Sequence, residues 1–169
     1  VSGTGSPMYY AARIAKEKYP DAKIVFVGPC VAKRKEAQRD EAVDFVMTFE
    51  EVSSIFDAFE VNLEIVQPYA MEFSSVREAH GFAQAGGVMG AVKAFLKMEA
   101  DKINAIQVSD LNKKNIGTLR AYAKSGKAPG QFIEVMACEG GCITGPSTHS
   151  GSNGKRQLVQ ELAKQEKTY

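Results

Sequence analysis

The hydrophobic pattern of the chain begins with a helix. Pro7 follows Ser6, which predicts a helix start because proline fits the first helical position. The helix is expected to end before Pro20, because the residue that precedes a proline disfavours the helical conformation. The apolar residues expected on one face are Tyr10, Ile14 and Ala15.

A strand-like pattern follows. Residues 23–28 contain a continuous apolar run, typical of a parallel strand buried on both faces, and they end in a turn at Gly28, Pro29 and Cys30. The charged residues 31–41 predict an exposed loop or a short helix, and residues 42–47 predict a second strand. Thr48 and Glu51 then form a capping box, which predicts a helix to about residue 59.

The second half continues this alternation. Residues 67–77 have no clear period and are interpreted as a loop. Helices are expected at 88–97, 112–125 and 155–167, a strand at 104–109 and a flexible stretch at 147–153. Gly126 is the expected stop of the middle helix. The side chains expected to face inward are Val88, Val92, Phe95, Leu96, Ile116, Leu119 and Tyr122.

The last predicted strand leads into a pair of cysteines. Residues 132–137 are an apolar run typical of a buried strand, and Cys138 and Cys142 follow with Gly140 and Gly141 between them. Glycines allow positive φ angles and a close approach of the backbone to a bulky group. Two thiolates on such a loop suggest a soft metal or a cluster, although small buried cysteines that only pack are an open alternative.

Strands that alternate with helices predict an α/β fold with a mostly parallel sheet flanked by helices. Such sheets bind ligands beyond the carboxyl ends of their strands. Cys30 follows one strand, and Cys138 and Cys142 follow another. The sequence therefore predicts that the three thiols are neighbours in space.

Composition narrows the function classes. The 169 residues suffice for one domain or two small lobes, and a net charge of +1 gives no reason to expect nucleic acid or an anionic membrane surface. Three cysteines, an odd number, favour a reducing compartment over a secreted disulfide scaffold. The sequence does not begin with methionine, so it is expected to be a fragment of a longer protein.

Two segments resemble a known family. Residues 28–36 and 134–142 resemble two of the three signature motifs of the catalytic domain of FeFe (iron-only) hydrogenases. Residues 44–51 and 86–89 look like connecting segments of that domain in the same order. The resemblance covers nearly the whole chain and implies that residues 1–169 are part of the two-lobed H-cluster domain, without its N-terminal part.

The resemblance implies a cofactor and roles for individual residues. The family's H-cluster is a 4Fe–4S cubane, held by four cysteines and joined through one of them to a di-iron unit with carbon monoxide, cyanide and a dithiolate bridge. It interconverts protons and electrons with hydrogen. By resemblance, Cys30 and Cys138 are cubane ligands and Cys142 bridges to the di-iron unit. The residues implied to surround the cofactor are Lys33, which would hydrogen-bond a cyanide, Met136, which would pack near the di-iron unit, Gly28, Pro29, Gly140 and Gly141.

Two of these residues also have a purely structural interpretation that needs no cofactor. Lys33 lies in a basic run, and charge patterning alone favours a solvated surface charge. Met136 lies in an apolar strand and fits a core position equally well.

The chain departs from the family pattern in three places. The upstream motif with two adjacent cysteines is absent, so three of four cluster ligands are present, and the isolated fragment is expected to be inactive and without the H-cluster. Gly28 replaces a methionine and is expected to leave a gap beside the di-iron unit. The glycine-rich tail after the last cysteine is replaced by residues 144–149. The last two departures are similar to sensory members of the family.

Three functions follow from the resemblance. The first is an oxidoreductase domain of the hydrogenase type. The second is a hydrogen- or redox-sensing module of a signalling protein. The third is an iron–sulfur assembly factor of the same fold. A cytoplasmic location is expected, with a ferredoxin or an attached iron–sulfur or sensor domain as partner, and neither nucleic acid nor membrane.

Overall fold

The computed structural model describes residues 3–69, 75–149 and 151–165. The chain divides into two compact units, which are described separately. Unit 1 comprises Val1–Gln67 and Pro146–His149, and unit 2 comprises Pro68–Gly145 and Ser150–Tyr169. Among the described residues, no helix is long and apolar enough to cross a membrane.

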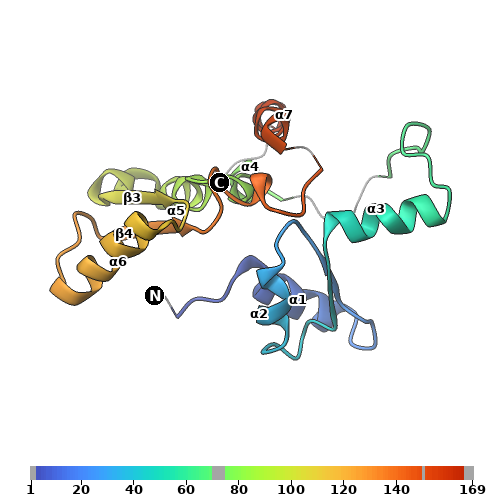
Figure 1. Cartoon of the computed structure of the whole chain (residues 1–169), viewed down its shortest axis with the longest axis horizontal. Helices are drawn as coiled ribbons and strands as arrows, with labels where there is room; N and C mark the ends of the chain where they lie inside the picture. Colours follow the sequence, from blue (N-terminus) through green and yellow to red (C-terminus); the bar gives the residue numbers. More distant parts are fainter. Residues whose placement is uncertain (1–2, 70–74, 150, 166–169) are drawn as a thin grey trace. The chain divides into compact units, whose positions relative to one another are not determined.

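Unit 1 holds a small parallel sheet with three helices. The elements are α1 (Pro7–Lys18), β1 (Val25–Val27), α2 (Ala32–Ala37), β2 (Phe45–Met47) and α3 (Phe49–Ala58) (Figure 1). β1 pairs with β2 in parallel, and Val25 lies opposite Phe45. Each predicted element of this part is present, and the parallel pairing of its strands is confirmed.

The capping signals in unit 1 are confirmed. The Ser6 side chain accepts a hydrogen bond from the Tyr9 N–H at 3.3 Å, and Pro7 is the first residue of α1. Thr48 and Glu51 form the predicted capping box at the start of α3, with the Glu51 N–H donating to Thr48 Oγ1 at 3.2 Å. These bonds satisfy donors that the first turn of a helix leaves without partners.

The buried face of α1 differs from the prediction. Met8 and Ala12 are buried, whereas Tyr10 and Ile14 are exposed. α1 carries more than one apolar stripe, and the stripe with Met8 and Ala12 is the one that packs with Val43 into the core of unit 1. Packing between elements, rather than periodicity, therefore selects the buried face.

The expectation that β1 is buried on both faces is wrong within this structure. Phe26 is half-buried and packs against the core of unit 1, whereas Val25 and Val27 are 44% and 42% exposed. Successive side chains of a strand point to opposite faces, so only one face of β1 meets this core.

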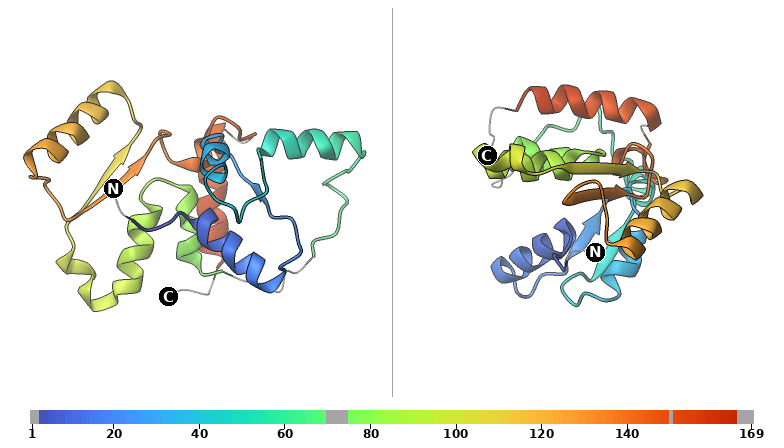
Figure 2. Two further views of the ribbon diagram at one scale, coloured as in Figure 1. Left: turned by 90° about the horizontal axis from the view of Figure 1, so that it is seen from below. Right: turned by 90° about the vertical axis from the view of Figure 1, so that its left-hand side faces the viewer.

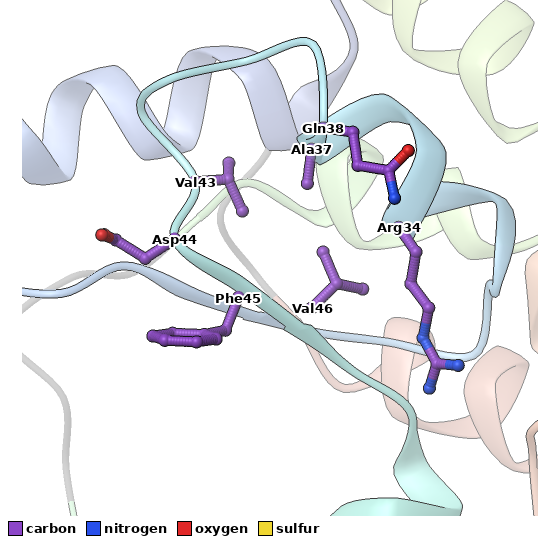
Figure 3. A pocket seen from close by; sticks show the side chains of 7 residues that line it. All are labelled: Arg34, Ala37, Gln38, Val43, Asp44, Phe45 and Val46. Atoms are coloured by element: carbon purple, nitrogen blue, oxygen red, sulfur yellow. The ribbon is translucent and has the colours of Figure 1, made fainter.

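A shallow hollow of about 220 Å³ lies between α2 and β2 (Figure 3). Its lining residues are Arg34, Ala37, Gln38, Val43, Asp44, Phe45 and Val46. None of these is a predicted ligand, so the hollow is separate from the candidate site.

Unit 2 holds a second parallel pair of strands (Figure 2). Its elements are α4 (Arg77–His80), η1 (Gly81–Ala83), α5 (Gly87–Leu96), η2 (Lys97–Lys102), β3 (Ala105–Ser109), α6 (Lys113–Ser125), β4 (Phe132–Met136), η3 (Cys142–Thr144) and α7 (Gly151–Ala163). β3 pairs with β4 in parallel, with Ser109 opposite Met136. The α/β class and the parallel strands are therefore confirmed in this unit as well.

Some boundaries and burial states in unit 2 differ from the predictions. Phe95 is 68% exposed rather than inward-facing, and Val135 of β4 is 41% exposed. The last helix begins at Gly151 instead of residue 155, which shortens the predicted flexible stretch. Gly126 ends α6 in a left-handed conformation, as predicted. Residues 70–74 of the predicted loop and residues 166 and 167 of the last predicted helix lie outside the described residues.

Candidate functional site

Each of the three cysteines begins a tight turn of the backbone. The Cys30 carbonyl accepts from the Lys33 N–H at 3.2 Å, and the Cys138 carbonyl accepts from the Gly141 N–H at 3.1 Å. The Cys142 carbonyl accepts from the Gly145 N–H at 2.9 Å. All three cysteines are half-buried. The turns fix the main chain beside each thiol, and half-burial leaves each side chain partly accessible.

The loop between Cys138 and Cys142 depends on its two glycines. Gly140 and Gly141 have φ angles of 80° and 101°, which confirms the predicted positive values. Gly141 also has a ψ of −170°, a combination that is essentially restricted to glycine. A Cβ on Gly141 would lie 2.4 Å from the Ala85 nitrogen. The loop therefore passes directly against the backbone that precedes α5.

Side chains on both sides hold this loop. The Gly140 N–H donates to Ser109 Oγ at 2.9 Å, and the Ser109 hydroxyl lies 3.5 Å from the Cys138 carbonyl. The Thr144 hydroxyl donates to the Gly141 carbonyl at 3.0 Å. Ser109 is the last residue of β3, so the end of that strand anchors the start of the cysteine loop.

Glu134 is a buried acid that lies within the last cysteine motif and for which no role was predicted from the sequence. It lies in the middle of β4 and is 5% exposed. One carboxylate oxygen accepts from the Gly86 N–H at 2.6 Å, and the other accepts from the Met89 N–H at 2.7 Å. A glutamate inside an apolar strand run was the available signal, because a buried carboxylate requires hydrogen-bond donors.

Met136 ends β4, two residues before Cys138, and is half-buried. Its carbonyl accepts from the Asp110 N–H at 3.0 Å, which continues the pairing beyond the end of β3. The position is compatible with strand core, and the role beside a di-iron unit stays a prediction.

The Cys30 turn follows the end of β1 in unit 1. Gly28 is buried, and its N–H donates to the Met47 carbonyl at 3.0 Å. A Cβ on Gly28 would lie 2.8 Å from a carbon of the Phe26 ring. The Phe26 ring therefore lies beside Gly28 within unit 1, and the expected gap beside a di-iron unit stays a prediction. Pro29 is half-buried between Gly28 and Cys30.

Lys33 is held in place by Glu36. Its ammonium group pairs with the Glu36 carboxylate, and the Ser6 hydroxyl donates to the same carboxylate. Partial burial raises the pKa of Glu36, but the hydrogen bonds from Lys33 and Ser6 outweigh it and hold the pKa below its ordinary value. The Lys33 side chain is 21% exposed, so it is an oriented, paired charge rather than a freely solvated one.

The two units divide the predicted site residues between them. Cys138, Cys142, Gly140, Gly141 and Met136 lie together at the end of β4 in unit 2. The predicted residues in unit 1 are Cys30, Lys33, Gly28 and Pro29. Within either unit taken alone, the described residues hold no group of three or more His, Cys, Asp or Glu side chains suited to a metal ion. The convergence of Cys30 with the cysteine pair stays a prediction.

These features define an α/β protein with thiols at the ends of parallel strands. The family described as "Iron only hydrogenase large subunit, C-terminal domain" matches residues 1–146. The chain belongs to this family, which confirms the resemblance drawn from the two cysteine motifs.

Characterised relatives include proteins with different names. The chain is 27% identical to the cytosolic Fe-S cluster assembly factor narfl of Danio rerio, over 98% of this chain and 54% of that protein. It is 28% identical to iron hydrogenase 1 of Clostridium pasteurianum, over 86% of this chain and 33% of that protein. The chain spans about half or less of the length of these relatives.

Solved structures show the same fold. A structure that describes stepwise assembly of the FeFe-hydrogenase H-cluster matches all of this chain and 62% of its own, with a TM-score of 0.65 and 21% identity. A structure concerned with oxygen inactivation of FeFe-hydrogenase matches with a TM-score of 0.66 and covers 61% of its own chain. The α/β fold of FeFe-hydrogenase is thereby shown for this chain.

Proposed function

We propose that this chain binds an iron–sulfur cluster as part of an FeFe-hydrogenase-like catalytic domain. The observation that carries the proposal is the Cys138–Cys142 loop, which follows a parallel strand and is bent by two glycines with positive φ. Cys30 follows a parallel strand in the same manner in the other unit. Membership of the hydrogenase family supports the assignment of all three as ligands.

The donor atoms fit such a cluster. Thiolates are the ligands that hold 4Fe–4S clusters, and tight loops rich in glycine let the main chain approach them closely. Cys30 and Cys138 would hold a cubane, and Cys142 would bridge it to a di-iron unit. When bound, the H-cluster would supply the interconversion of protons and electrons with hydrogen.

Lys33 would contribute a fixed positive charge near Cys30. The turn from Cys30 to Lys33 sets its backbone, and Glu36 sets the direction of its ammonium group. An ammonium group carries three donors, so the bond to Glu36 leaves capacity for a second acceptor such as a cyanide ligand. A charge-assisted bond of this kind is stronger than one between neutral groups.

The activity of the whole protein, its electron partner and its location are part of the same proposal. A ferredoxin or an attached iron–sulfur or sensor domain would exchange electrons with the cluster. A cytoplasmic location agrees with the word "cytosolic" in the names of several relatives.

Iron–sulfur assembly is the second candidate function. Several relatives carry that name, and the identity to one of them, 27%, nearly equals the 28% to an iron hydrogenase. Both candidates need the thiolates, but only hydrogenase chemistry needs a di-iron unit. A sensing role is a third option, which rests on Gly28 and on residues 144–149, where the chain departs from the family pattern.

Anaerobic reconstitution with iron and sulfide of the whole protein that contains this chain tests the shared part of the proposal. We expect the variants Cys30→Ser, Cys138→Ser and Cys142→Ser each to bind less iron and sulfide than the parent chain. Thr118→Ala, which removes a side-chain hydrogen bond to the Lys114 carbonyl within α6, is the control and should bind as the parent does. A Cys30→Ser chain that loads like the parent would remove Cys30 from the ligand set.

Infrared spectra separate the candidate functions. Bands from carbon monoxide and cyanide in the whole protein that contains this chain, together with hydrogen turnover, would support the hydrogenase function. A cubane without those bands would support the assembly function. Bands without rapid turnover would support sensing.

A further inference from the structure

Glu134 joins the cysteine strand to the start of a helix. Its two carboxylate oxygens accept hydrogen bonds from the Gly86 and Met89 N–H groups, at 2.6 and 2.7 Å. The glutamate lies on β4, four residues before Cys138. The N–H groups belong to the first turn of α5 and the residue before it, which carry the positive end of the helix dipole.

This pairing requires a carboxylate. Both oxygens act as acceptors, and each faces a main-chain donor. A glutamine of the same shape would place an NH₂ group against one of those donors and lose that bond. An aspartate keeps two acceptor oxygens but is shorter by one methylene, so its carboxylate is drawn back from the helix.

The segment directly before this helix touches the cysteine loop. The Ala85 N–H donates to the Gly140 carbonyl at 3.0 Å. Gly141 lies so close to this segment that a Cβ would be 2.6 Å from the carbonyl carbon of Gln84. The segment from Gln84 to Met89 is thus bonded to β4 through Glu134 and to the loop through Gly140.

We propose that Glu134 is a positioning residue that sets the orientation of the Cys138 and Cys142 thiols. Its carboxylate fixes the start of α5, and the cysteine loop lies against Gln84 and Ala85, the residues directly before that start. The effect on a bound cluster rests on the proposed function, whereas the effect on the thiols of the metal-free chain does not.

Thiol alkylation of the metal-free chain tests the proposal, with each cysteine followed separately by mass spectrometry. The variants are E134Q and E134D, and the control is E161Q, which removes an exposed glutamate from α7. Cys30, in unit 1, is a control within the same molecule. Because the thiolate is the reactive form, rates over a pH series separate a change in access from a change in ionisation.

We expect E134Q to raise the alkylation rates of Cys138 and Cys142 about tenfold at every pH. The reason is that loss of one charge-assisted hydrogen bond makes local opening of the loop more frequent, and the thiols react in the opened state. Cys30 should be unaffected, E161Q should match the parent chain, and E134D should recover part of the difference. Unchanged rates in E134Q would overturn the proposal. Equal acceleration of Cys30 would also overturn it, because it would indicate general loosening of the fold.

A cluster readout extends the test. After reconstitution, E134Q should lose iron to a chelator faster than E161Q does and show an altered electron paramagnetic resonance signal. If the whole protein that contains this chain takes up no iron, the proposed function fails while the alkylation result still decides the role of Glu134. If all chains load and lose iron alike, the proposed effect of Glu134 on the cluster is wrong.

Discussion

Replacement of Gly141 by alanine should disrupt the cysteine loop. The residue has φ 101° and ψ −170°, a region that residues with a side chain enter at a cost of about 1–3 kcal/mol. The conformation cannot relax easily, because the Gly141 N–H closes the Cys138 turn and the Gly141 carbonyl accepts from Thr144.

Crowding adds to this cost. The new Cβ would lie 2.4 Å from the Ala85 nitrogen and 2.6 Å from the Gln84 carbonyl carbon, and both atoms belong to the main chain. Overpacking of this kind costs about 1–3 kcal/mol. Alanine also restricts the unfolded chain more than glycine does, and this offsets the destabilisation by about 0.4–1 kcal/mol. Together these effects predict that Gly141→Ala lowers the free energy of unfolding by about 1–6 kcal/mol.

Urea denaturation, combined with hydrogen exchange at β4 and α5, measures the effect in unit 2. Gly117→Ala is the matched control, because it makes the same change within α6 where a Cβ meets no atom within 4 Å. The control should stabilise the chain by about 0.5–1 kcal/mol, since alanine favours the helix over glycine. Equal stability of Gly141→Ala and the parent chain would refute the close approach of the loop to α5.

Three further predictions concern unit 1, at Met8, Thr48 and Asp44. Met8→Ala should cost about 2–4 kcal/mol in urea denaturation because the Met8 side chain is buried, whereas Met8→Leu should cost less than about 1.5 kcal/mol. Thr48→Ala removes the capping hydroxyl of α3 and should lower stability by about 1 kcal/mol, measured in the same way. The Ile24 N–H and the Lys23 ammonium lower the pKa of Asp44 to about 2. The ionised Asp44 therefore stabilises unit 1 above its unfolded pKa of about 4, and this contribution is lost as the pH falls toward 2. Asp44→Asn should flatten the dependence of stability on pH in that window, and a carboxyl resonance of Asp44 that titrates near 4 would contradict the assignment.

Local signals in the sequence predicted three helix boundaries correctly. Ser6 and Pro7 mark the start of α1, Thr48 and Glu51 mark the start of α3, and Gly126 marks the end of α6. Each of these signals acts through bonds or φ angles within about four residues, so the sequence contains the whole interaction.

Burial was harder to predict, because it depends on partners that are distant along the chain. α1 has apolar residues on more than one face, and only contact with Val43 decides that Met8 and Ala12 are inside. The pattern of α5 suggested that Phe95 faces inward, yet its side chain is 68% exposed. Periodicity gives the width of an apolar face but does not identify the element that covers it.

The cysteine loop has one feature that the sequence predicted and others that it did not. The presence of Gly140 and Gly141 predicted the positive φ angles of the loop, because few other residues adopt them. The supports of the loop were not predicted, since Ser109 is 29 residues from Cys138 along the chain and Glu134 is 48 residues from Gly86. Only the pairing of β3 with β4 and the position of α5 bring these groups together.

These supports have a consequence for metal binding. The carbonyls of Cys138, Gly140, Gly141 and Cys142 all accept hydrogen bonds from the protein itself. The shape of the loop is therefore maintained by hydrogen bonds to Ala85, to Ser109 and within the loop. A cluster that binds here would mainly have to fix the cysteine side chains, and ordering a few side chains costs much less than ordering a main chain of the same length. Substitutions at Ser109 or Glu134 should accordingly weaken metal binding even though neither residue offers a ligand to the metal.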